Sequence, residues 1–338
     1  MKIDMTFSGN PEDVVASAES AENSGADGLF IPETRHDPFL QLALASQTTE
    51  RIELGTSVAI AFARNPMTVA NTSYDLQRLS GGRMVVGLGS QVAPHITRRY
   101  SMPWSKPAAR MEEFAAALRA IWHSWGSGDK LDFRGDFYTH TLMTPMFDPG
   151  PLEVDSPRIW IAGVGPKMTE AAGRVADGLI CHSFTTAEYL RDITVPTVNV
   201  GRASASSARK EFDVSGLILF ATGRTEEEYD AAVTATRERL AFYGSTPAYR
   251  PVLDHHGWGA LHEELYGLSR QGRWQEMGAL IDDQVLDTFA IVGELESIGR
   301  QAHARFGGLL TRMTVALVQE DSGDLQLEIA DRIVRSAA

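Results

Sequence analysis

The sequence contains a single cysteine, Cys181, in 338 residues. An internal disulfide is therefore impossible, and a reducing compartment fits this use of cysteine. A basic tract is missing too, because the net charge is −13 and the only local cluster of positive charge is Arg98-Arg99. A nucleic-acid-binding surface needs clustered Lys and Arg, so we expect no nucleic-acid partner.

Long apolar runs are also missing. No stretch reaches the roughly 20 residues that a transmembrane helix needs, and the N-terminal residues have the pattern of a strand rather than of a signal peptide. We therefore expect a cytoplasmic protein with no membrane partner. The absence of a Gly-x-Ser-x-Gly elbow and of a Walker loop disfavours hydrolases and nucleotide triphosphatases. His255-His256 lacks a matching set of ligands, so no metal is predicted.

Short β-branched segments alternate with helical patterns along the whole chain. The hydrophobic content of 43% and the charged content of 22% are those of an ordinary globular protein. Eight strands are predicted, at Lys2–Phe7, Asp27–Ile31, Ile52–Ile60, Arg83–Leu88, Arg158–Ala162, Asp177–Cys181, Val214–Ala221 and Leu310–Val318. This alternation predicts an α/β fold, a (β/α)8 TIM barrel, as one domain over residues 1–338. Insertions are expected at about 91–107, 126–157 and 244–309.

Helical spacing of apolar residues, proline at first positions and glycine after last positions mark the helices. They are expected at Pro11–Asn23, Phe39–Thr48, Met67–Leu79, Ala108–Trp125, Lys167–Val175, Thr185–Ile193, part of Arg202–Glu211, Thr225–Tyr243 and Leu325–Ser336. Two or three more helices are expected after a loop at His255–Trp258. The alternating segment Lys130–Thr144, centred on Arg134-Gly135, predicts a hairpin within an insertion.

In a barrel of this kind the active site lies at the carboxyl ends of the strands. That rule nominates Phe7, Ser8, Glu33 to His36, Val58 to Ile60, Ser90, Gln91, Gly163 to Gly165, His182, Ser183 and Thr222. The rule gives a place and not a chemistry. Cys181, which precedes His182, is interpreted as a packing residue.

The turn from Gly163 to Thr169 has the composition of a phosphate cradle. Two glycines and Pro166 lie between a strand and the first turn of a helix, where bare backbone N–H groups and the positive helix end attract anions. Lys167 adds charge there, or it is simply exposed to solvent. The alternative for the whole segment is a tight turn that binds nothing.

Several polar residues at strand ends have two readings. His36 is either a donor to a developing charge or part of the cap of the next helix, and Asp37 is the N-cap ahead of Pro38. Arg64 binds an anionic cofactor tail or forms a surface salt bridge. The side chains of Ser90 and Gln91 can hydrogen-bond to the edge of a heterocyclic ligand. The alternative for Gln91 is a solvent-exposed loop residue.

Two motifs carry a family resemblance. The GTSV strand, the RNP turn and LSGGR leading into GLG, all within 51–90, resemble the luciferase-like flavin and deazaflavin oxidoreductases. The segment PRIWIAGVGPKMTEAAGRVADGLI, Pro157 to Ile180, resembles the branch that uses coenzyme F420. The resemblance covers nearly the whole chain. It implies hydride transfer between a small organic substrate and C5 of the deazaflavin.

The same resemblance assigns roles to residues. It implies a cis peptide bond at Ser57–Val58 behind the cofactor ring, and a phosphate held by the turn made of Gly163, Val164, Gly165, Pro166, Lys167 and Met168. Their positions in the loops after strands add Arg64 and Ser90 to the cofactor-binding set, and Glu33, His36 and Gln91 are taken as the catalytic candidates on the substrate side. The sugar-phosphate dehydrogenases of the family carry an Asp-His pair where this chain has Thr34-Arg35. They also carry a glutamate at a position that falls near Val92 in this chain, which has no glutamate there. Both departures argue against that activity.

Three alternatives stay open at this point. An FMN-dependent monooxygenase of the same fold would need a flavin reductase as partner, and a non-catalytic cofactor-binding protein would need none. An unrelated barrel lyase or hydrolase would need a metal or a lysine at a strand end. Members of the family pair through their early helices, so a homodimer is expected.

Overall fold

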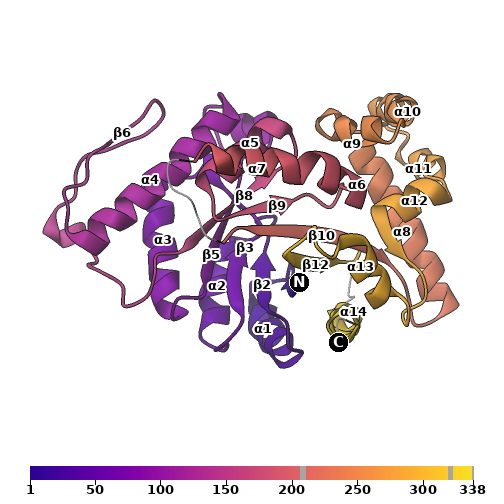
Figure 1. Cartoon of the computed structure of the whole chain (residues 1–338), viewed down its shortest axis with the longest axis horizontal. Coiled ribbons are helices and arrows are strands. Elements are labelled where there is room, and N and C mark those ends of the chain that lie inside the picture. Colours follow the sequence, from indigo (N-terminus) through magenta and orange to yellow (C-terminus); the bar gives the residue numbers. More distant parts are fainter. Residues whose placement is uncertain (206–210, 319–322, 337–338) are drawn as a thin grey trace.

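The computed structural model describes residues 1–205, 211–318 and 323–336. Within these ranges eight parallel strands close into a barrel surrounded by helices, which confirms the predicted fold (Figure 1). Parallel pairing runs from β1 through β2, β3, β5, β8, β9, β10 and β12 back to β1. The strands are β1 (Lys2–Thr6), β2 (Gly28–Ile31), β3 (Glu53–Thr56), β5 (Met84–Gly89), β8 (Arg158–Gly163), β9 (Gly178–Cys181), β10 (Asp213–Ala221) and β12 (Arg312–Ala316).

Helices connect these strands and cover the outside of the barrel (Figure 1). They are α1 (Val14–Asn23), α2 (Pro38–Ser46), α3 (Pro66–Leu79), α4 (Pro107–Ser127), α5 (Pro166–Val175), α7 (Val195–Ala203), α8 (Glu226–Gly244), α13 (Ile298–Phe306) and α14 (Gly323–Arg335). Local chemistry starts two of them where the sequence predicts. The Asp37 side chain accepts a hydrogen bond of 2.9 Å from the backbone N–H of Phe39, and Asn65 accepts one of 2.8 Å from Met67.

The third predicted strand is interrupted. β3 ends at Thr56, and the chain resumes pairing in β4 (Ala59–Ile60), which is bonded to β5. The peptide bond between Ser57 and Val58 is cis, as the resemblance implied. The predicted single strand Ile52–Ile60 is therefore two strands on either side of this bond.

The insertions contain short elements. The predicted hairpin is present as β6 (Phe133–Arg134) and β7 (Thr139–His140), and Figure 1 shows it projecting from the barrel. Inside and outside the insertions there are short 3-10 helices, η1 (Pro11–Asp13), η2 (Ala61–Ala63), η4 (Pro145–Phe147), η6 (Pro247–Tyr249) and η7 (Gly278–Leu280), and a short π-helix, η3 (His95–Arg99). The later segment adds α9 (Arg250–His255), α10 (Gly259–Arg270), α11 (Trp274–Met277), α12 (Asp283–Phe289) and β11 (Ala290–Val292).

Two predictions in the second half were wrong in part. After β9 the chain forms α6 (Ala187–Tyr189), η5 (Leu190–Thr194) and α7, whereas the sequence placed the second helix in part of Arg202–Glu211. Pro196 and the β-branched residues around it mask α7 in the sequence. Residues 206–210 of the predicted helix lie outside the described residues. His255 ends α9 rather than lying in a loop, and β11 was missed.

Two stacked rings form the floor of the barrel interior. Phe30 of β2 and Trp160 of β8 have ring centroids 5.1 Å apart and an interplanar angle of 13°. Glycines on neighbouring strands make room for them, because a Cβ at Gly55 would lie 2.5 Å from the Phe30 ring and one at Gly178 would lie 2.6 Å from the Trp160 ring. Val85 and Ile180 complete this buried layer.

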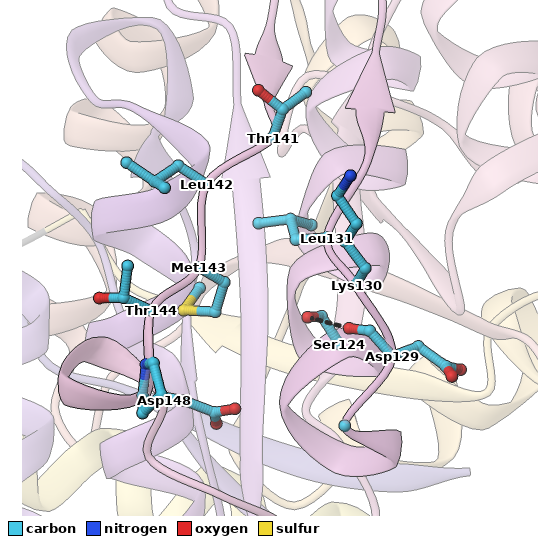
Figure 2. Close-up of a pocket in the computed structure, with 11 residues that line it drawn as sticks. Ser124, Asp129, Lys130, Leu131, Thr141, Leu142, Met143, Thr144 and Asp148 are labelled. Atoms are coloured by element: carbon cyan, nitrogen blue, oxygen red, sulfur yellow. Dashed lines mark hydrogen bonds between the residues drawn. The ribbon is translucent and has the colours of Figure 1, made fainter.

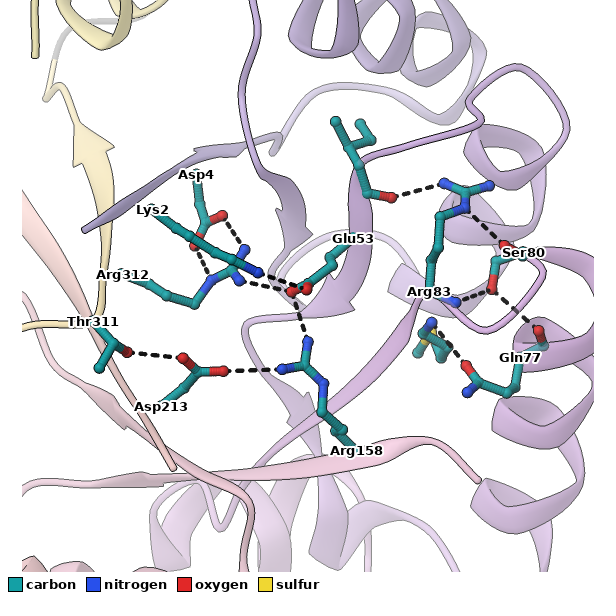
Figure 3. A network of polar contacts seen from close by, with 12 residues as sticks. Lys2, Asp4, Glu53, Gln77, Ser80, Arg83, Arg158, Asp213, Thr311 and Arg312 are labelled. Carbon is teal, nitrogen blue, oxygen red and sulfur yellow. Dashed lines mark hydrogen bonds and ion pairs between the residues drawn. The ribbon is translucent and has the colours of Figure 1, made fainter. Parts of the chain in front are cut away.

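Beneath the rings, at the amino ends of the strands, lies a network of charged side chains (Figure 3). Arg312 binds both oxygens of Asp4 at 2.8 and 2.5 Å and lies 2.7 Å from Glu53. Arg158 joins Glu53 at 2.6 Å to Asp213 at 3.0 Å. Burial raises the pKa of Asp4 to about 6, against the opposing effect of Arg312. Asp4 and Arg312 are fully buried, so charged side chains fill the barrel interior at the amino ends of the strands.

Candidate active site

Val58 lies above the aromatic floor. Its side chain is half-buried and packs with the layer formed by Phe30 and Trp160. A Cβ on Gly89 would lie 2.5 Å from the Val58 side chain, so glycine at that position of β5 is what admits it. The Val58 carbonyl accepts a hydrogen bond of 3.0 Å from the backbone N–H of Glu33. The residue after the cis bond therefore presents an apolar side chain at the barrel mouth, and the loop after β2 holds it there.

Glu33 is the centre of a small polar network. One carboxylate oxygen accepts hydrogen bonds from Arg64 and, at 2.7 Å, from the backbone N–H of Ile60. The other oxygen lies 3.4 Å from the Tyr100 hydroxyl. Arg64 also binds Asp37 at 2.9 Å. These three donors hold the Glu33 carboxylate in one position beside the cis bond.

The pairing bears on the predicted role of Arg64. Its guanidinium is only 18% exposed and lies between Glu33 and Asp37. The sequence left open a surface salt bridge or an anionic cofactor tail as its partner, and the structure shows a largely buried salt bridge. Tyr100, which no sequence pattern marked, reaches Glu33 from the segment after η3. Burial and the Glu33 carboxylate raise the pKa of Tyr100.

The loop after β5 brings Ser90 and Gln91 to the mouth. Gln91 has a φ of 59°, in the left-handed region that side chains rarely adopt. Its side-chain oxygen accepts a hydrogen bond of 2.9 Å from the backbone N–H of Val92, and the Ser90 hydroxyl bonds to the Gln91 carbonyl at 3.1 Å. These contacts hold the loop, and within the described residues they involve the side-chain oxygen of Gln91 and not its amide NH2.

The predicted phosphate turn has open backbone donors. Gly165 is the N-cap of α5, and its carbonyl accepts the N–H groups of Met168 and Thr169 at 3.1 Å. Over the described part of the chain, the N–H groups of Val164, Gly165 and Lys167 have no hydrogen-bond acceptor. A Cβ built on Gly165 would meet no atom within 4 Å. The turn therefore offers unsatisfied donors facing free space at a helix N-terminus.

The remaining predicted residues lie around this mouth. His36 is half-buried in the loop before α2, Lys167 is exposed, and Met168 is half-buried on α5. Cys181 is buried in a hydrophobic cluster, which confirms its packing role, and burial raises its pKa to about 12.

The match to a family model decides the relationship. The model for luciferase-like monooxygenases matches residues 3–312. The chain belongs to the luciferase-like monooxygenase family. Its barrel therefore belongs with other luciferase-like barrels, as the motifs GTSV and LSGGR indicated.

Relatives and solved structures agree with this. An uncharacterized Mycobacterium tuberculosis (strain H37Rv) protein, Rv1360, is 51% identical over 306 residues, which are 90% of each chain. The 5,10-methylenetetrahydromethanopterin reductase of Archaeoglobus fulgidus is 26% identical over 82% of this chain and 81% of its own. The coenzyme F420-dependent tetrahydromethanopterin reductase structure from Methanopyrus kandleri superposes with a TM-score of 0.80, at 17% identity and over 99% of both chains.

A separate cavity of about 610 Å³ lies in the insertion of this luciferase-like chain (Figure 2). It is lined by the end of α4 and by the two arms of the hairpin, with Asp129, Lys130, Leu142 and Asp148 among its residues. Leu142 is 77% exposed, so this cavity is an open surface groove. It shares no residue with the site at the strand ends.

No helix among the described residues combines the length and the apolar character that crossing a bilayer requires.

Proposed function

We propose that this protein is an oxidoreductase that uses coenzyme F420. The observation that carries the proposal is the turn at Gly165, whose unpaired N–H groups and open space at the start of α5 suit a phosphate group. The resemblance of Pro157 to Ile180 to the F420-using branch points to the same cofactor. Membership of the luciferase-like family and the relatedness to reductases support it.

In this proposal the bound deazaflavin supplies a hydride-carrying carbon, C5, for exchange with a small organic substrate. Val164, Gly165 and Lys167 hold the phosphate through backbone N–H groups. Val58 lies against one face of the ring. Glu33 and Gln91, with His36, orient the substrate or the ring edge on the open side.

The N-cap position allows a test that separates binding from folding. Gly165 has a φ of −84° and a ψ of 156°, which any residue adopts. Gly165→Asp adds a preferred N-cap that bonds to the first turn of α5, so the melting temperature stays unchanged or rises. The new carboxylate also occupies the cradle and repels phosphate. We expect F420 affinity, measured by fluorescence titration, to fall on the order of 10-fold or more, equivalent to about 1.4 kcal/mol.

Gly165→Ala is the matched control, because it fills the space with a methyl group and no charge; its F420 affinity should exceed that of the Asp variant. Gly267→Asp, on α10, places the same charge at another glycine with open surroundings and should leave affinity unchanged. If the wild-type protein binds FMN and not F420, the FMN-dependent monooxygenase replaces the present proposal. Binding of F420 without turnover of any substrate would favour a non-catalytic cofactor-binding protein.

A homodimer is the assembly we propose. Leu40 and Leu44 lie one turn apart on α2 and are 69% and 46% exposed. Apolar side chains repeated on one helical face favour contact with a second copy. Light scattering of the wild type and of Leu40→Glu tests this: the wild type should have twice the mass of the variant.

A further inference from the structure

A group of rings lies at the carboxyl end of β9. Cys181, the last residue of β9, is in register with Gly163 of β8, where the candidate phosphate turn begins. Side chains alternate along a strand, so His182 continues the face of Ile180. Ile180 packs with Phe30 in the barrel interior. The His182 ring therefore lies at the mouth, one level above the aromatic floor.

Tyr249 reaches the same place from the segment that follows α8. Its ring stacks on His182, with centroids 4.4 Å apart and an interplanar angle of 25°. Tyr249 also packs in a hydrophobic cluster with Leu217 and Leu219. These two leucines alternate with Ile218, which packs in the outer core, so they line the inner face of β10. The Tyr249 ring and hydroxyl are thus placed beside His182, directly after the end of β9.

Hydrogen bonds determine where the protons of this pair lie. The backbone N–H of Phe184 donates to Nδ1 of His182 at 3.0 Å, so Nδ1 carries no hydrogen. Burial lowers the pKa of His182 to about 4, so the ring is neutral at pH 7 and its hydrogen is on Nε2. Nε2 lies 3.0 Å from the hydroxyl oxygen of Tyr249 and therefore donates to it.

The phenol hydrogen of Tyr249 consequently takes no part in the bond with His182. Burial raises the pKa of Tyr249 to about 12, so the phenol keeps this hydrogen at pH 7. In residues 1–205, 211–318 and 323–336, the hydroxyl's hydrogen bond is the one that it accepts from His182. A donor that itself accepts a hydrogen bond is polarised and becomes a stronger donor.

We propose that Tyr249, positioned by His182, donates a hydrogen bond to a carbonyl or hydroxyl oxygen of the substrate. The inference rests on the proposed function and adds the substrate class: aldehydes or ketones and the corresponding alcohols. Reduction would bring hydride from C5 of reduced F420 to the carbonyl carbon, shift the C=O π pair to oxygen and take one proton from solvent to complete the alcohol. The oxygen gains negative charge on this path, so a donor aimed at it binds the transition state more tightly than the ground state. Tyr249 would then be a catalytic residue, and His182 a positioning residue.

The chain offers a matched control for this pair. Tyr266 on α10 stacks on His262 at 6.0 Å and 17°, a second tyrosine-histidine stack. Nδ1 of His262 bonds to the carbonyl of Gly244 and not to tyrosine. Tyr266→Phe therefore removes a hydroxyl from a similar ring pair away from the strand ends.

The experiment uses reduced F420 with a panel of aliphatic and aromatic aldehydes and ketones, and oxidised F420 with the matching alcohols. We expect Tyr249→Phe to lower kcat/KM on the order of 10- to 100-fold, mainly through kcat, with F420 affinity unchanged. His182→Phe, which keeps the packing and loses the donor, should act similarly. His182→Gln retains an N–H donor at the Nε2 position and should restore part of the activity. Tyr266→Phe should stay within twofold of the wild type.

The outcomes separate the two proposals. A Tyr249→Phe variant that keeps wild-type kcat/KM overturns the inference. So does a wild type that binds F420 but converts none of the carbonyl compounds or alcohols, and this result leaves the proposed function standing. A wild type that fails to bind F420 overturns both. If Tyr249→Phe lowers the melting temperature together with kcat/KM, the role of Tyr249 is structural, and this result also contradicts the inference.

Discussion

Replacement of Arg312 by methionine tests the interpretation of the barrel bottom as a buried, balanced ion network. Arg312 has no exposed surface, and it is the only ion-pair partner of Asp4 among the described residues. Glu53, by contrast, keeps Lys2 and Arg158 when Arg312 is lost. The variant therefore leaves one fully buried carboxylate, Asp4, without an ion-pair partner among the described residues.

The expected loss follows from that geometry. Breaking a buried pair by removing one partner costs about 3–5 kcal/mol. Asp4 can relieve part of this by taking up a proton, since burial already raises its pKa to about 6 and the opposing Arg312 is gone. Protonation at pH 7 from a pKa of 6 requires only about 1.4 kcal/mol. We therefore expect Arg312→Met to lose about 3 kcal/mol of unfolding free energy at pH 7.

The pH dependence has a definite sign. The pKa of Asp4 is raised on folding from 3.8, so its contribution to stability is present below pH 3.8 and is lost as the pH rises through the folded pKa. In the variant that pKa is higher still, so the loss, which begins at the unfolded value of 3.8 in both proteins, continues to a higher pH. At pH 5 the difference between variant and wild type should therefore shrink by about 1 kcal/mol.

Urea unfolding followed by tryptophan fluorescence at pH 5 and pH 7 measures both quantities. Arg224→Met is the control, because the Arg224–Glu328 pair of 2.9 Å is exposed and should contribute less than about 1 kcal/mol. Asp4→Asn in the Arg312→Met background should recover part of the loss. A loss below about 1 kcal/mol at pH 7, or an equal loss at both pH values, would refute the reasoning.

Three further predictions concern other parts of the molecule. Gly55→Ala should lose about 1–3 kcal/mol in urea unfolding, because its Cβ would lie 2.5 Å from Phe30, whereas Gly126→Ala in open space on α4 should be neutral or stabilising. Cys181, with its pKa raised to about 12, should have a thiolate fraction of about 10⁻⁴ at pH 8 and react with a thiol reagent only on unfolding; rapid reaction of the native protein contradicts this. Glu113→Ala should speed hydrogen exchange at 136–138, whose three N–H groups bond to Glu113 at 2.6–2.8 Å; unchanged exchange would show that the hairpin holds without it.

Local signals in the sequence were enough to place the barrel strands and most of the helices. β-branched runs marked buried strands, and Asp37 ahead of Pro38 marked a helix start, because a cap acts within two or three residues. α7 was misplaced because its own residues favour extended structure, and its contacts with α5 outweigh that preference.

The cis bond at Ser57–Val58 was expected from resemblance alone. Composition and periodicity had indicated an uninterrupted strand from Ile52 to Ile60, and the structure shows two strands with the bond between them. The family motif thus carried information that the physical pattern of this segment did not contain.

Pairings between distant residues could not be read from the chain. Glu33 and Arg64 are 31 residues apart, and His182 and Tyr249 are 67 apart. Each had been assigned or ignored as a single residue. Which partner a half-buried charge or a histidine nitrogen finds depends on the closure of the barrel, which brings β2, β4 and β9 to one rim together with the segment after α8.

The amino-acid order is therefore sufficient for the elements, their succession and the rim where chemistry takes place, since hydrophobic period, caps and turns act over a few residues. Packing assigns the rest. The stacked floor of Phe30 and Trp160, the ion network around Arg312 and the proton arrangement of His182 and Tyr249 exist only once the sheet closes. Burial and hydrogen-bond geometry decide these features, and both are properties of the folded chain.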